Sequence, residues 1–129
     1  MIERYSRKEL KDIWSDYNRY SIWLKIEIAA AEAMEKLKII PRGVSQAVKK
    51  RGKINVKRIL QIEEKVKHDI IAFLTSITER VGPLGKYLHK GMTSSDVLDT
   101  CFNLQLKQSG EILLKDLIVL ISTLKKQAI

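Results

Sequence analysis

Apolar residues recur at helical spacing along almost the whole chain, with polar residues between them. Positions three and four apart share one face of an α-helix, so this spacing predicts amphipathic helices. No useful length of sequence alternates apolar and polar residues as a strand would, and there is no internal repeat. The predicted helices cover residues 6–15, 17–38, 41–50, 55–66, 69–81 and 93–129. The predicted fold class is therefore all-α.

Capping and breaking residues set the ends of these helices. Ser6 and Glu9 have the spacing of a capping box, and Asn55 and Asp69 are the predicted caps of two later helices. Pro41 ends the second helix, because the residue before a proline is pushed out of the helical region.

The last predicted helix is the longest and the most apolar. Thr93 followed by Asp96 is a second capping pair at its start, and Cys101 falls on its core-facing side. From Ile112 onward this helix is apolar nearly all round, which predicts burial on every side. We therefore expect the chain to be the front part of something larger. Residues 1–92 would form a helical domain, and residues 93–129 would form the first long helix of an incomplete bundle.

Composition and charge limit the classes of partner that the chain can bind. With 45% hydrophobic and 30% charged residues, the chain has the balance of a soluble globular protein. The net charge of +9 would suit a polyanion, but the lysines are scattered along helix faces and no basic platform with interleaved aromatic residues is present. Solvation of the surface is therefore favoured over binding of nucleic acid.

Targeting signals are not evident either. The single cysteine permits no internal disulfide, which suggests a reducing compartment and hence the cytoplasm. The N-terminus lacks the apolar core of a signal peptide. The most apolar run, residues 112–121, contains Lys115 and Asp116 and is too short to cross a membrane. The spacings of a zinc site, a P-loop or a dinucleotide fingerprint are also missing.

Two places combine polar chemistry with a helix end. The start of the last helix, at Thr93 and Ser94, would stabilise a carboxylate or a phosphate, because a helix N-terminus carries partial positive charge and free N–H donors. Simple capping explains such a motif more often. At the other place, Lys67, His68 and Asp69 interrupt the apolar pattern between two helices. A structural role and a ligand-contacting role are equally supported for His68 by its own position.

Three segments together carry a resemblance to a known family. Residues 2–6 (IERYS), 67–73 (KHDIIAF) and 89–96 (HKGMTSSD) resemble, in order and spacing, the adenylosuccinate lyase family of the fumarase/aspartase superfamily. The third segment alone indicates the superfamily, and the other two favour this family over argininosuccinate lyase or fumarase. The likeness extends over essentially the whole chain but covers only about the first third of a family member.

The resemblance implies an activity. Family members cleave a C–N bond without hydrolysis, releasing fumarate from adenylosuccinate to leave AMP, and from the succinylated carboxamide ribotide to leave its amide. It implies no metal and no organic cofactor. It also implies a homotetramer whose active sites each draw on three subunits. The family's second histidine and its glycine- and serine-rich loop with the catalytic serine match no part of these 129 residues, so we expect the isolated chain to be inactive.

The resemblance assigns substrate-binding residues and no catalytic ones. Thr93 and Ser94 match positions that contact the substrate. Arg4 and Tyr5 match positions that contact the nucleotide. The remaining group is Lys67, His68 and Asp69, in which Lys67 stands where an arginine is expected, keeping the charge but losing the bidentate fork. For His68 a binding role is favoured over proton transfer, and His89 is expected to orient the loop before Thr93.

Two other classes of function stay open at this point. The chain would also suit a non-catalytic helical module that associates through its apolar last helix, with His68 and the Thr93 cap purely structural. A basic nucleic-acid binder is the third reading, and it predicts binding that weakens steeply with salt.

Overall fold

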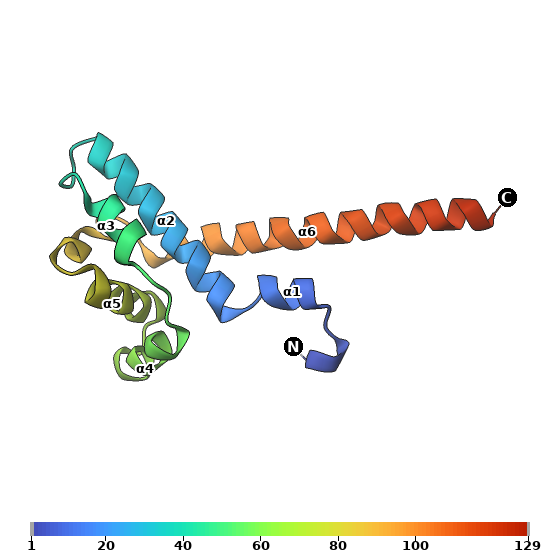
Figure 1. The fold of residues 1–129 in the computed structure, drawn as a ribbon, viewed down its shortest axis with the longest axis horizontal. Helices are drawn as coiled ribbons and strands as arrows, with labels where there is room; N and C mark the ends of the chain where they lie inside the picture. The colour runs from blue at the N-terminus through green and yellow to red at the C-terminus, as the bar shows by residue number, and fades with distance from the viewer. Residues whose placement is uncertain (1, 129) are drawn as a thin grey trace.

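The computed structural model describes residues 2–128 and is all-α in this range, as predicted. Two short 3-10 helices and six α-helices follow one another without a strand between residues 2 and 128. In chain order they are η1 (Glu3–Tyr5), α1 (Lys8–Ile13), α2 (Asp16–Lys36), α3 (Val44–Arg51), α4 (Val56–Val66), α5 (Asp69–Val81), η2 (Pro83–Tyr87) and α6 (Ser94–Gln127). Helices α2 to α5 form a packed group at one end of the molecule, and α6 leaves it as a long rod (Figure 1).

Three aromatic side chains form the centre of the packed group. Tyr20 and Trp23 of α2 and Phe73 of α5 are each at most 1% exposed, and their ring centroids lie 5.1 to 6.1 Å apart. Such rings bury a large apolar area; Trp23 meets the other two edge to face, and Tyr20 and Phe73 are stacked. Val97 and Cys101 of α6 complete this core, and burial raises the pKa of the Cys101 thiol, as expected for a structural cysteine.

The first capping prediction is wrong. The first helix begins at Lys8 with Arg7 at its cap position, and the hydroxyl of Ser6 donates to the carbonyl of Ile2 at 2.8 Å. The Ser6 hydroxyl therefore closes the turn of η1, and no side chain makes a capping hydrogen bond to α1. The caps at Ser15 and Asn55 accept backbone hydrogen bonds from the first turns of α2 and α4.

The third helix starts three residues later than predicted. Gly43 occupies its cap position with φ of +97°, a backbone conformation that suits glycine, and the helix proper begins at Val44. The carboxylate of Glu35 on α2 accepts from the N–H of Ser45 at 2.6 Å, so a side chain from another helix supplies the cap. The predicted second helix also runs two residues too far, because Lys38 has φ of +58°.

The long last helix is confirmed as far as Gln127, and Gly110 does not interrupt it. Ile129, which the prediction included, lies outside the described residues. Residues 94–109, the proximal half of α6, bury one side chain per turn; these are Val97, Cys101, Gln105 and Ser109. Residues 110–127, the distal half, bury none. The proximal half of α6 packs into the same core as the helices before it. The division into domains at residue 92 stays a prediction.

Candidate functional site

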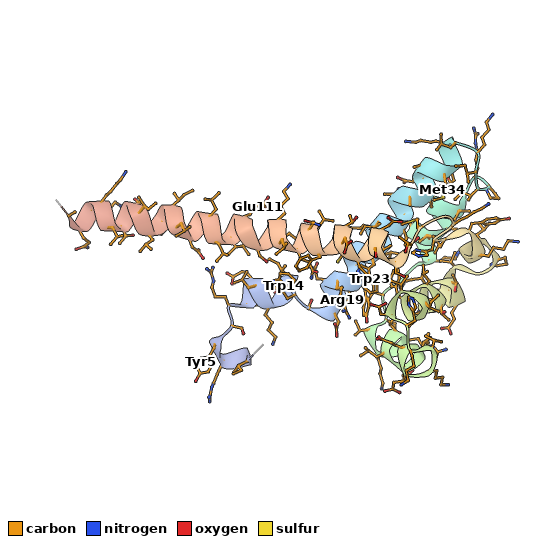
Figure 2. All side chains as sticks on the ribbon, turned by 180° about the vertical axis from the view of Figure 1, so that it is seen from behind. Tyr5, Trp14, Arg19, Trp23, Met34 and Glu111 are labelled. Carbon is orange, nitrogen blue, oxygen red and sulfur yellow. The ribbon has the colours of Figure 1, made fainter. Side chains whose placement is uncertain are left out.

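Arg4 and Tyr5 lie on η1, at the tip of an arm that leads into α1. Both are exposed, Tyr5 by 74%, and the guanidinium of Arg4 lies 4.8 Å from the centroid of the Tyr5 ring. In Figure 2 the Tyr5 side chain points away from the other labelled residues. Arg7, at the end of the arm just before α1, pairs with Asp116 of α6 and with Glu9. The arm therefore presents both candidate side chains to solvent and is tied to the side of α6.

Lys67, His68 and Asp69 form the two-residue link between α4 and α5 and the first residue of α5. Lys67 ends α4 in the left-handed conformation with φ of 54°, and His68 follows with extended backbone. The cap of α5 is His68, whose Nδ1 accepts from the N–H of Ile71 at 3.4 Å. The prediction that Asp69 caps α5 is therefore wrong. The Asp69 carboxylate accepts from the N–H of Ile70 at 2.7 Å instead.

Thr93 and Ser94 stand at the start of α6, and the predicted capping pair is present. The carboxylate of Asp96 accepts from the backbone N–H of Thr93 at 2.8 Å. Thr93 is exposed and Ser94 is half-buried. Within residues 2–128 the Ser94 hydroxyl makes no hydrogen bond, so it is free to donate to a ligand held at this helix end.

A buried residue that the sequence pattern did not predict lies beside the loop that precedes Thr93. Glu27 of α2 is only 1% exposed, and its carboxylate binds His89 twice: Oε2 accepts from the backbone N–H at 2.9 Å and Oε1 lies 2.6 Å from Nδ1. The signal was a lone carboxylate on the apolar stripe of α2, between Trp23 and Ala31. His89 is thereby held against α2, four residues before Thr93, with its side chain half-buried.

The structure does not bring the three candidate groups together within one chain. The arm with η1 lies beside the middle of α6, whereas α4 and α5 lie in the packed group at the end of the molecule away from the C-terminus (Figure 1). Each group is accessible, but a single chain does not enclose one site from all three. The described residues also contain no cluster of three or more histidine, cysteine or acidic side chains that could hold a metal ion.

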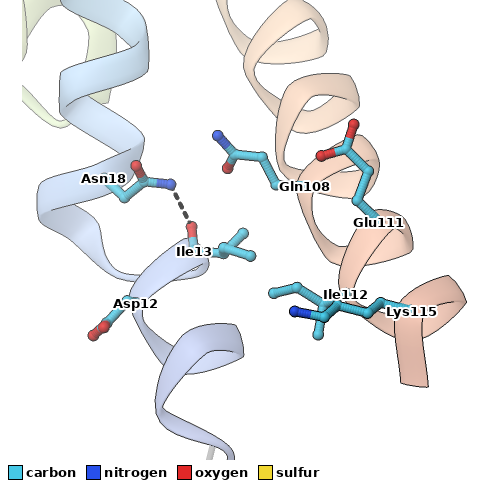
Figure 3. Close-up of a pocket in the computed structure, with 7 residues that line it drawn as sticks. All are labelled: Asp12, Ile13, Asn18, Gln108, Glu111, Ile112 and Lys115. Carbon is cyan, nitrogen blue, oxygen red and sulfur yellow. Dashed lines mark hydrogen bonds between the residues drawn. The ribbon is translucent and has the colours of Figure 1, made fainter. Parts of the chain in front are cut away.

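A separate groove runs between α1 and the middle of α6 (Figure 3). Its lining residues are Asp12, Ile13, Asn18, Gln108, Glu111, Ile112 and Lys115. The side-chain amide of Asn18 donates to the carbonyl of Ile13 at 2.8 Å, which closes the junction of α1 and α2 on one wall. None of the residues predicted for the site lines this groove. No helix within residues 2–128 is both long and apolar enough to span a membrane.

Comparison with known proteins gives matches along nearly the whole chain. It is 42% identical over 128 residues to adenylosuccinate lyase of Bacillus subtilis, and 45% identical over 128 residues to adenylosuccinate lyase of Synechocystis. Both matches cover 99% of this chain, which spans 30% of the length of each relative. Among solved structures, a fumarate lyase from Mesorhizobium matches 80% of this chain and 26% of its own, with a TM-score of 0.70 and 26% identity. A family model described as Lyase matches residues 3–129, and the chain therefore belongs to this lyase family.

Proposed function

We propose that the chain supplies part of the substrate site of an adenylosuccinate lyase. This enzyme would eliminate fumarate from adenylosuccinate to give AMP, and from the succinylated carboxamide ribotide. The support is the identity of 42% and 45% to two proteins of that name over 99% of the chain. Because the chain spans 30% of their length, we propose that it is inactive alone.

The observation that carries the proposal is the pair of hydroxyls at the start of α6. In this elimination a base removes the proton beside a carboxylate, and negative charge builds on that carboxylate. Donors already aimed at the developing charge lower the barrier. The free hydroxyl of Ser94, the exposed Thr93 and the N–H groups of the first helical turn are such donors.

The other groups would bind the rest of the substrate. The Arg4 guanidinium is suited to a phosphate, and the Tyr5 phenol to hydrogen bonding or stacking. Lys67 offers a single ammonium, His68 a ring whose Nδ1 is engaged with the α5 backbone, and Asp69 a partly buried carboxylate. None of these residues is proposed as the base or the acid, which we assign to other parts of a longer protein or of a neighbouring subunit.

We also propose that the complete site forms between subunits of a homotetramer. The separation of η1 from α4 and α5 within one chain supports this, since groups that cannot meet in one chain can meet across copies (Figure 1). The apolar distal half of α6 would pack in a helical bundle. A cytoplasmic location fits the free, buried Cys101.

A chimera tests the activity. This chain replaces the matching segment of the Bacillus subtilis relative, and fumarate release from adenylosuccinate is measured. We expect turnover by the chimera and none by the isolated chain. Ser94→Ala should lower kcat/KM about tenfold, the loss of roughly one hydrogen bond to a charged group. Ser95→Ala, its exposed neighbour, is the control and should stay within about twofold, well inside the range of a neutral surface substitution.

Three results would contradict parts of the proposal. An assembled chimera that does not release fumarate would remove the activity. Unchanged kcat and KM in Ser94→Ala would remove the role of this hydroxyl, and fumarate release by the isolated chain would show that the chain needs no further residues.

A further inference from the structure

Glu27 is a carboxylate in a seam that is otherwise apolar. It shares the buried face of α2 with Tyr20, Trp23 and Ala31, at helical spacings of three and four residues. A carboxylate buried to this extent is strongly destabilising unless hydrogen-bonded groups compensate it. The partner that compensates it therefore has a fixed place in the fold.

That partner is His89, 62 positions along the chain. Each carboxylate oxygen takes one contact, Oε2 with the backbone N–H at 2.9 Å and Oε1 with Nδ1 at 2.6 Å. An ionised carboxylate only accepts hydrogen bonds, so Nδ1 carries the proton. The other ring nitrogen, Nε2, makes no hydrogen bond within residues 2–128, and the side chain keeps 18% of its surface exposed.

The same contacts fix an unusual turn. His89 has φ of 59°, in the left-handed region that few residues other than glycine adopt, and Gly91 follows with φ of 72°. Residues held in this conformation persist only where their surroundings impose it. On either side Leu88 is buried in the core and Met92 packs against it. The next residues are Thr93 and Ser94, so the Glu27 contacts set the position at which α6 begins.

We infer that Glu27 is a positioning residue for the start of α6: its buried carboxylate holds the backbone and Nδ1 of His89, fixes the position of Thr93 and Ser94, and leaves Nε2 as the ring atom available to accept a hydrogen bond from a donor group of the substrate. The inference rests on the proposed function for the identity of that substrate. The hold of Glu27 on His89 itself is independent of any ligand.

Ring tautomers test the hold directly in the 129-residue chain. The chain has two histidines, and their hydrogen-bond partners predict opposite tautomers for them. In His68 the Nδ1 accepts from the Ile71 N–H, which leaves the proton on Nε2, whereas His89 keeps it on Nδ1. Nitrogen-15 spectra of both rings, recorded at alkaline pH, separate the two neutral forms by their chemical shifts.

In Glu27→Gln we expect the His89 tautomer to reverse. A glutamine side chain offers one acceptor and one donor group, so when its oxygen accepts from the backbone N–H its amide donates to Nδ1. Glu27→Asp should keep the proton on Nδ1, and His68 should not change in either variant. A proton on Nε2 of His89 in the unaltered chain overturns the inference, and this result does not depend on any variant folding.

The chimera described above tests the consequence for substrate. Glu27→Gln should lower kcat/KM for adenylosuccinate at least tenfold, and Glu27→Asp should recover part of it. Glu32→Gln, on an exposed carboxylate of the same helix that pairs with Lys49, is the matched control. Equal activity in Glu27→Gln and Glu32→Gln overturns the positioning role. A chimera that binds no adenylosuccinate contradicts the proposed function instead, while the tautomer result still decides whether Glu27 holds His89.

Discussion

The two halves of α6 differ in their apolar pattern and in what covers them. The proximal half buries one side chain per turn, and two of the four are polar and bonded to α1: Gln105 donates to the carbonyl of Ile13 at 2.8 Å, and Ser109 accepts from Nε1 of Trp14 at 3.1 Å. In the distal half Asp116 pairs with Arg7, and Glu111, Ile112 and Lys115 line the groove against α1. One continuous helix is therefore packed into the core along its proximal half and largely exposed along its distal half.

The distal half exposes far more apolar surface than a water-soluble helix needs. Eight large apolar side chains are each more than half exposed: Leu113, Leu114, Leu117, Ile118, Val119, Leu120, Ile121 and Leu124. A contiguous patch of this kind marks an interface. The proximal half has a narrow buried stripe, as a helix at the edge of a domain has, whereas the distal half has the all-round apolar pattern of a helix in the middle of a bundle.

The largest expected effect is on association through the distal half. Leu117→Glu combined with Ile121→Glu places two charges on one face of this patch. Each substitution removes roughly 1.5–3 kcal/mol of apolar burial and adds the cost of burying a charge, so association should weaken about a thousandfold or more. Sedimentation equilibrium measures the change, and circular dichroism checks that the helices remain.

Leu37→Glu combined with Ile39→Glu is the control for this pair. These side chains are also exposed, by 71% and 51%, but they lie after α2 and outside the distal half. Association should be unchanged. If the unaltered chain is monomeric at tens of micromolar, or if both double variants behave alike, the distal half is not an interface.

A second comparison uses one valine from each half of the same helix. Val97 is fully buried, and Val119 is 58% exposed. Val97→Ala should lower the free energy of unfolding by about 2 kcal/mol through lost burial and the cavity left behind. Val119→Ala should change it by less than about 0.5 kcal/mol. Urea unfolding is measured in the background of Leu117→Glu with Ile121→Glu, so that association does not contribute. Similar losses at both positions would show that the two halves are equally packed.

The sequence predicted what depends on neighbouring residues. Apolar spacing identified the α-helices, Asn55 identified the start of α4, and Thr93 with Asp96 identified the start of α6, because each signal lies within one turn of the feature it specifies. The surplus of apolar surface in the distal half was also legible from periodicity alone.

What the sequence did not predict depends on contacts between distant positions. Ser6 has the spacing of a cap but bonds back to Ile2, and α3 takes its cap from Glu35 on another helix. In the sequence Glu27 is a single charged residue on an apolar stripe, and only the structure shows that it contacts His89. The residues proposed for the site could be chosen by resemblance, but the separation of η1 from α4 and α5 required the fold.

The smallest predicted effect is a loss of stability at low pH, and it is confined to the packed helices. Backbone hydrogen bonds from the start of α3, chiefly from Ser45, lower the pKa of Glu35 below its ordinary value. A lowered pKa stabilises the fold fully above the ordinary glutamate pKa of about 4.3, and this contribution is lost as the pH falls through the lowered value. Glu35→Gln should therefore cost about 0.5 kcal/mol near pH 7, a cap discounted for partial exposure, and nothing in strong acid. Urea unfolding at several pH values measures the difference. Hydrogen exchange locates this loss of stability along the chain. We expect it at α3 and not in the distal half of α6. An equal loss in both would mean that they unfold as one cooperative unit.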